Sequence, residues 1–151
     1  MTNTRRTIGV VLCQIALIAC GAGDDSINAT LACVRDLDED CEPSIPATFD
    51  SLYTNIVQVR CSVSGDSPSC HSAKSKQGGL DLSTPARAYD GLVGKTKDGR
   101  ERVLPGDPEC STLMERVEAD DDTLRMPRNE ERLAAGLRCA IQQWIAEGAK
   151  P

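Results

Sequence analysis

The stretch Cys61-Ser-Val-Ser-Gly-Asp-Ser-Pro-Ser-Cys70-His71 contains the only histidine of the 151-residue chain. This histidine directly follows one cysteine, and a second cysteine lies a short loop upstream. Two thiols beside an imidazole are the groups through which proteins attach haem covalently, because the thiols add across the vinyl groups while the imidazole takes an axial position on the iron. The stretch therefore predicts a covalent haem site.

The spacing of the two thiols differs from the usual C-x-x-C-H arrangement, because eight residues separate Cys61 from Cys70. Lengthening the loop from two to eight residues costs about 1.2 kcal/mol of closure entropy, which covalent attachment easily offsets. The alternative is a disulfide between Cys61 and Cys70, with His71 an ordinary loop residue. The residues leave both interpretations open.

The first 19 residues resemble an export signal. Arg5 and Arg6 precede an apolar run over residues 8–19 that is too short to span a bilayer. The run ends in Leu-Ile-Ala-Cys20, as in a bacterial lipoprotein signal, so we expect Cys20 to carry the lipid that anchors the mature protein. We therefore expect a cell-envelope protein on the periplasmic side or at the outer membrane. An ordinary cleaved signal or a buried apolar segment is the alternative.

The chain is acidic, with a formal net charge of −6. Removing residues 1–19 takes away two arginines and no acid, which changes the charge to −8. An acidic surface repels phosphate backbones and attracts cationic surfaces, so we expect no nucleic-acid partner and favour a basic redox partner protein.

The chain has eight cysteines, which behind an export signal indicate an oxidising compartment. Cys13 leaves with the signal. With Cys20 lipidated, six remain: Cys33, Cys41, Cys61, Cys70, Cys110 and Cys139. We expect a Cys110–Cys139 disulfide between the two later helices, and Cys33 and Cys41 could close a small loop. A zinc site is disfavoured because the haem interpretation already uses the one histidine.

The residue pattern predicts a mostly α-helical domain with long loops. Residues 20–48 are acidic and rich in Pro, Ser and Gly, so we expect a flexible tether there. Helical spacing appears over 49–60, 85–93 and 130–147, and Asp107-Pro108-Glu109 is typical of the start of another helix. Only four residues in the chain are aromatic. A flat apolar cofactor or disulfides would supplement so thin a core.

From residue 49 to the C-terminus the chain resembles the small c-type cytochrome domains of planctomycete and myxobacterial exported proteins. The matching stretches, in chain order, are the helix ending at Cys61 with Cys70-His71, then 78–82, then 103–113, then Arg125-Met126-Pro127 with the final helix. The resemblance implies a small cytochrome c-like domain over 49–151 around one covalent haem c. It also implies His71 and Met126 as the iron ligands. A thioether suits low-spin iron, although a methionine can also simply fill a gap in a core.

These observations predict single-electron transfer by a lipid-anchored monohaem c-type cytochrome. The alternative is a haem-free, disulfide-stapled envelope lipoprotein that acts as an interaction module. No nucleophile–base pair is visible, and a single histidine does not suit a haem peroxidase. We therefore expect an electron carrier and not a catalyst with its own substrate.

Overall fold

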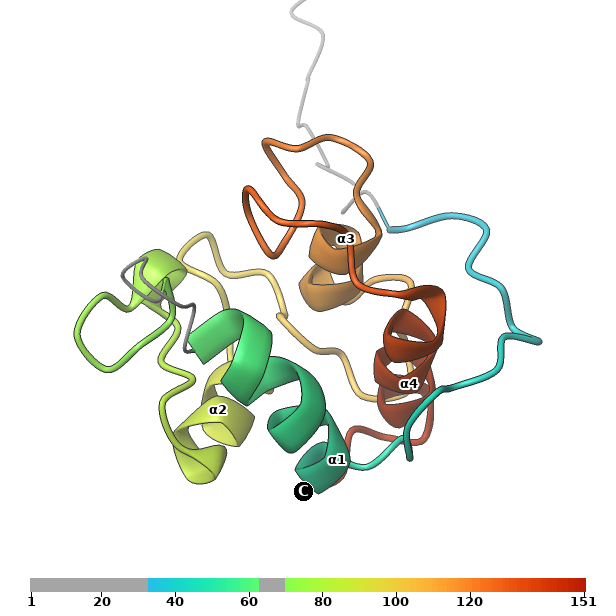
Figure 1. Ribbon diagram of the computed structural model, residues 1–151, viewed down its shortest axis with the longest axis horizontal. Helices are drawn as coiled ribbons and strands as arrows, with labels where there is room; N and C mark the ends of the chain where they lie inside the picture. The colour runs from blue at the N-terminus through green and yellow to red at the C-terminus, as the bar shows by residue number, and fades with distance from the viewer. Residues whose placement is uncertain (1–32, 63–69) are drawn as a thin grey trace, which may run out of the picture. The chain divides into compact units, whose positions relative to one another are not determined.

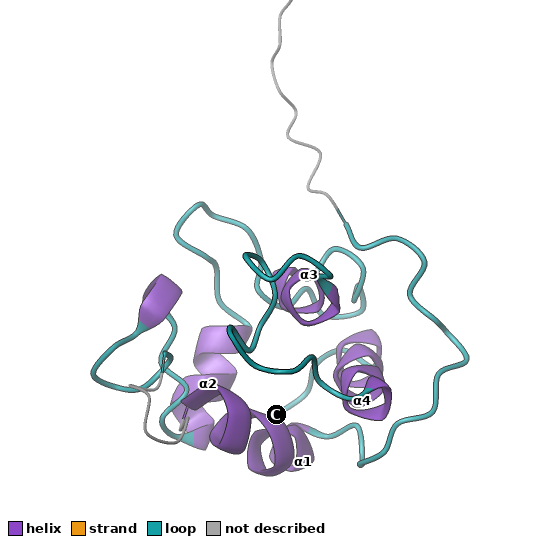
Figure 2. Ribbon diagram, turned by 45° about the horizontal axis from the view of Figure 1, so that its top comes forward, coloured by secondary structure: helices purple, strands orange, loops and turns teal. Residues whose placement is uncertain are grey.

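The computed structural model describes residues 33–62 and 70–151. Six helical segments follow one another in these ranges: α1 (Phe49–Leu52), η1 (Tyr53–Ser62), η2 (Gln77–Gly79), α2 (Pro85–Leu92), α3 (Thr112–Glu118) and α4 (Ala135–Ala146). Long loops join them, and the described residues form no strand, only two isolated bridges (Figure 2). The expected mostly α-helical fold with long loops is confirmed. None of the helices in the described ranges is long and apolar enough to cross a membrane.

The first helix is the one that leads to Cys61. Thr48 caps it by accepting a hydrogen bond from the Ser51 amide at 3.4 Å. After Leu52 the helix continues as π-helical turns through η1 to Ser62. Turns of this wider type are rare in proteins, and those that occur are often found at functional sites.

The later helices are shorter than the sequence pattern predicted. α3 begins at Thr112 and not near Pro108, because Asp107 accepts a hydrogen bond from the Cys110 amide at 3.0 Å and holds a tight turn. α4 begins at Ala135, and the expected first residue, Glu130, instead forms an ion pair with Arg60. α2 agrees with the prediction, with Pro85 in its first turn.

The core gathers around Phe49 at the start of α1. Its ring lies 5.2 Å from that of Tyr89 and 5.8 Å from that of Trp144, measured between centroids. Tyr89 donates to the carbonyl of Ala149 at 3.1 Å, and Trp144 donates to that of Lys150 at 2.7 Å. The polar atoms of these two rings are therefore satisfied by the chain's last residues, which fastens the C-terminus to α2 and α4. Figure 1 shows the C-terminus beside the start of α1.

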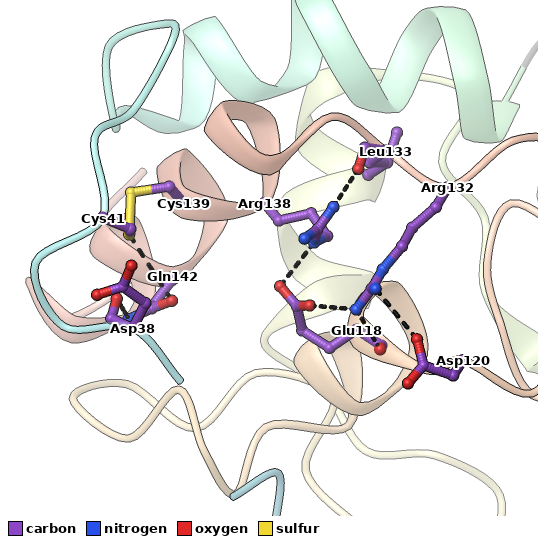
Figure 3. Close-up of polar contacts among 9 residues, drawn as sticks. All are labelled: Asp38, Cys41, Glu118, Asp120, Arg132, Leu133, Arg138, Cys139 and Gln142. Atoms are coloured by element: carbon purple, nitrogen blue, oxygen red, sulfur yellow. Dashed lines mark hydrogen bonds and ion pairs between the residues drawn. A yellow bond between two sulfur atoms is a disulfide. The ribbon is translucent and has the colours of Figure 1, made fainter. Parts of the chain in front are cut away.

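The disulfides differ from the expected pairing. Cys33 joins Cys110, and Cys41 joins Cys139, so the predicted Cys110–Cys139 disulfide is wrong. Cys110 and Cys139 are therefore each bonded to the segment before α1. This segment runs beside α4 (Figures 1 and 3). The small loop closed by Cys33 and Cys41 is likewise not formed.

Residues 33–48, which we expected to belong to a flexible tether, are fastened to the domain. Ser44 donates its amide to the Gly136 carbonyl at 3.0 Å, and Gln142 donates to the Asp38 carbonyl at 2.9 Å. A Cβ on Gly136 would lie 2.7 Å from that of Ser44, so only glycine allows this approach. The two disulfides and these bonds make the segment an outer layer over α4.

Candidate functional site

A cavity of about 590 Å³ lies between the helices, within the range of pockets that hold small molecules and cofactors. Its walls are mostly apolar side chains from all the longer elements: Phe49, Leu52, Ile56, Val57, Leu80, Leu82, Leu92, Leu113, Val117, Leu133, Ile141 and Trp144. Cys61, Cys70, His71 and Met126 also line it. Residues that are distant in the sequence, and that the sequence analysis selected separately, therefore border one space.

The backbone around His71 is held by neighbouring loops. The His71 carbonyl accepts from the Leu82 amide at 2.7 Å, and the Cys70 carbonyl accepts from the Gln77 amide at 2.8 Å. Asp81 is fixed in turn by the Ser83 hydroxyl at 2.6 Å. The stretch 78–82, one of the motifs that carry the family resemblance, therefore holds the backbone of His71 in place through the Leu82 amide.

The imidazole of His71 has a defined tautomer. Its Nδ1 lies 3.0 Å from the carbonyl oxygen of Gln77. Because a carbonyl can only accept, Nδ1 carries the proton and Nε2 keeps a lone pair. Burial lowers the pKa of His71 below its ordinary value, which favours the neutral ring. A neutral imidazole whose other nitrogen donates to a carbonyl is the form in which histidine binds metals.

The two cysteines at the cavity are chemically distinct from the other four described ones. Cys61 and Cys70 are the only free thiols among the residues the structure describes, so the alternative Cys61–Cys70 disulfide is not formed here. Burial raises the pKa of Cys61 to about 12, so its sulfur stays uncharged at neutral pH. A thioether is also uncharged, and the same burial would not oppose it.

Met126 lies in the loop between α3 and α4. Its amide donates to the Arg116 carbonyl at 2.8 Å, which ties this part of the loop to α3. Pro127, directly after it, is buried. Met114, the methionine in α3, is fully buried in the core.

The two ends of the Met126 loop meet at one carboxylate. Glu118, at the end of α3, binds Arg132 at 2.6 Å and Arg138 at 2.8 Å (Figure 3). Arg138 lies in the first turns of α4, and Arg132 lies just before that helix. We call Glu118, Arg132 and Arg138 the carboxylate clamp. It closes the base of the loop that carries Met126.

A second cavity, of about 370 Å³, adjoins the first and shares Cys70, His71 and Met126 with it. Its lining includes five cationic side chains: Lys97, Arg100, Arg102, Arg116 and Arg128. This cluster was not predicted from the sequence. Its members come from the loop between α2 and α3, from α3 and from the Met126 loop, and no spacing in the sequence connects them.

The comparison with known families gives one match. Residues 68–130 match the family model for planctomycete cytochrome C. No curated protein and no solved structure matches the chain. The matched segment contains Cys70, His71 and Met126, whereas Cys61 precedes it. Together with the helical, strand-free architecture of the described residues, this match supports a cytochrome c domain of the planctomycete type.

Proposed function

We propose that this protein is a single-electron carrier in which one haem c is bound covalently through Cys61 and Cys70. The cytochrome c family implies haem and electron transfer in general. The single observation that carries covalent attachment of one haem is that two free thiols, an imidazole with an available nitrogen lone pair and a thioether line one apolar cavity.

The donor set fits the group. His71 offers Nε2 because its Nδ1 proton is bound to the Gln77 carbonyl. Met126 offers a soft sulfur from a loop that α3 and the carboxylate clamp hold in place. Histidine and methionine together are the ligand pair of cytochromes c, and the thioether raises the reduction potential by favouring ferrous iron.

The other role of the chain in this proposal is to enclose the haem and to orient its ligands. When bound, haem supplies the reversible one-electron chemistry of its iron. The apolar walls from η1, α2, α3 and α4 would surround a bound haem, and low polarity around its iron would favour the less charged ferrous state. The Gln77 carbonyl keeps the His71 ring in one orientation, so the ligand geometry is set before the electron arrives.

The proposal extends to the location of the protein. Residues 1–32, including the predicted signal peptide and Cys20, lie outside the described residues, so the lipid anchor stays a prediction. We infer that lipid on Cys20 would hold the domain at the cell envelope, on the periplasmic side or at the outer membrane. The acidic chain would then favour a basic redox partner protein.

The second candidate function is a haem-free interaction module. The observation that favours it is the pair of disulfides, which would stabilise a small extracytoplasmic domain without a cofactor. It gives no role to the free thiols, His71 and Met126 at the large cavity.

A ligand test separates the two candidates. The protein would be produced with a haem-attachment system, and the oxidised spectrum would be compared for wild type, Met126→Leu and the control Met114→Leu. We expect the weak sulfur-to-iron band near the red end of the spectrum to be absent only in Met126→Leu. Loss of the band in the core control alone, or colourless wild-type protein, would contradict the electron-carrier proposal.

A further inference from the structure

The second cavity is strongly cationic in a protein that is acidic as a whole. Its lining has five cationic side chains and one carboxylate, that of Asp98, whereas the chain carries a formal charge of −6. A concentration of one charge against the overall sign marks a place where an anion is favoured. The volume of about 370 Å³ lies within the range of pockets that hold small molecules.

Three arginines of this cavity have charges that no described carboxylate pairs. Arg102 donates to two backbone carbonyls at 3.1 and 3.0 Å. Arg116 donates to one carbonyl at 3.3 Å, and Arg128 to another at 3.1 Å. Among the described residues none of the three forms an ion pair, in contrast to Arg100, which binds Glu115 at 2.6 Å. Backbone carbonyls therefore orient the three guanidinium groups, and most of their five N–H donors remain available.

Two buried polar atoms of the same lining have no hydrogen-bond partner among the described residues. They are the side-chain hydroxyl oxygen of Thr112 and the Nε of Arg100. Thr112 is 7% exposed. Buried polar groups in proteins are nearly always hydrogen-bonded, and an exception calls for an explanation such as a bound water or ion. The two unsatisfied atoms therefore point, independently of the net charge, to a polar ligand in this cavity.

The carboxylates of a bound haem do not supply this ligand. Under the proposed function Cys70 is attached to a vinyl group of the haem, and Cys70 lines the second cavity. The two propionate carboxylates of haem lie at the edge opposite to its vinyl groups. The cations of the second cavity therefore require an anion from another source.

A tetrahedral oxyanion suits the donors that are present. A guanidinium group binds two oxygens of a phosphate through parallel N–H bonds, and an ammonium group such as that of Lys97 binds it as a point charge. The Thr112 hydroxyl can donate to a further oxygen. Because Thr112 is buried, the ligand that reaches it has to be small, which favours a free ion over a side chain on the surface of another protein.

We propose that the second cavity binds an inorganic oxyanion of the phosphate class, through its three unpaired guanidinium groups and the hydroxyl of Thr112. The inference rests on the proposed function in one respect, the position of the haem carboxylates. His71 and Met126 line both cavities, so the anion would lie beside the iron ligands. Its negative charge would favour ferric iron, and phosphate would therefore lower the reduction potential of the carrier.

The test is a set of variants of the holoprotein. Thr112→Val replaces the hydroxyl by a methyl group of the same shape. Arg116→Gln removes one guanidinium, and Arg116→Lys keeps its charge without the planar fork. Arg35→Gln is the matched control, because Arg35 is exposed and lines neither cavity. In phosphate-free buffer Thr112→Val should be at least as stable to heat as wild type, because it removes an unsatisfied buried hydroxyl.

The first readout is calorimetric titration with inorganic phosphate, with chloride holding the ionic strength constant. Wild-type protein should bind one phosphate per chain. Thr112→Val and Arg116→Gln should each weaken the affinity by about tenfold or more, because each removes a hydrogen bond to a charged group. Arg116→Lys should fall between wild type and Arg116→Gln, and Arg35→Gln should bind as wild type does.

The second readout is the midpoint potential with and without phosphate at the same ionic strength. Phosphate should lower the potential of wild type and of Arg35→Gln, and it should have little effect on Thr112→Val at the same concentration. Wild-type protein that binds no phosphate, or equal affinities in all the variants, would overturn the inference. Colourless wild-type protein that still binds one phosphate, with the loss in Thr112→Val, would support the anion site and remove the proposed function.

Discussion

The carboxylate clamp offers a direct test of how the fold holds Met126. Glu118 binds Arg132 and Arg138 at 2.6 and 2.8 Å. The side chains of Glu118 and Arg138 are each 18% exposed, and that of Arg132 is 34% exposed, so the pairs are largely removed from water. Glu118→Gln keeps the size of the side chain and removes the charge that both guanidinium groups share.

The expected loss of stability follows from this burial. Breaking a buried ion pair on one side costs about 3–5 kcal/mol, and exposed pairs are worth about 0–1 kcal/mol. For a clamp about a fifth exposed we expect about 2 kcal/mol, between the two limits. The base of the Met126 loop should loosen as well, because Arg132 and Glu118 are the residues that close it.

The assay is denaturant unfolding of the holoprotein, followed both by helix content and by the sulfur-to-iron band. In Glu118→Gln the band should disappear at a lower denaturant concentration than the helix signal, whereas in wild type the two should coincide more closely. Asp122→Asn is the control, since its pair with Arg125 involves a carboxylate that is 81% exposed. Equal effects in the two variants, or a band that persists as long as the helices in Glu118→Gln, would refute the reasoning.

Three further predictions concern the framework and the anchor. Replacing Cys41 and Cys139 together by serine should lower the free energy of unfolding by about 2–4 kcal/mol, because their disulfide closes a long loop; denaturation of purified protein checks this, and a loss below about 1 kcal/mol would count against it. The Ser83 hydroxyl, and secondarily Arg87, lowers the pKa of Asp81 to about 2. The stabilisation from Asp81 should therefore be complete above its unfolded-state pKa and be lost as pH falls toward 2, and Asp81→Asn should flatten this part of the pH–stability curve, whereas an unchanged curve would exclude the effect. Changing Cys20 to Ser should move the protein from the membrane fraction to the soluble fraction after export, and wild-type protein found wholly in the soluble fraction would contradict the lipid anchor.

The haem-site candidates could be selected from the sequence because their chemistry is local. A histidine beside a cysteine and a Met-Pro step before a helix are readable in a few residues, and so is the apolar spacing of α2 and α4. The structure then brings Cys61, Cys70, His71 and Met126 to one cavity, which periodicity alone could not establish.

The N-terminal segment could not be predicted because its contacts are distant in the sequence. The two disulfides join cysteines that are 77 and 98 positions apart, and an acidic, proline-containing composition gives no sign of docking. For the same reason the cationic cluster at the second cavity could not be predicted, since Arg102, Arg116 and Arg128 come together only through the folding of separate segments. The predicted start of α4 was wrong because Glu130, its expected first residue, forms an ion pair with Arg60 instead.

The measurement that tests the central claim most directly is the mass and colour of the denatured protein after its disulfides are reduced. The protein would be made with a haem-attachment system, and the double variant Cys61→Ala with Cys70→Ala would serve as control. We predict that wild-type chains keep one haem each in denaturant, since thioethers survive unfolding and reduction, and that the double variant loses it. Wild-type protein that is free of haem, with Cys61 joined to Cys70 before reduction, would contradict the account.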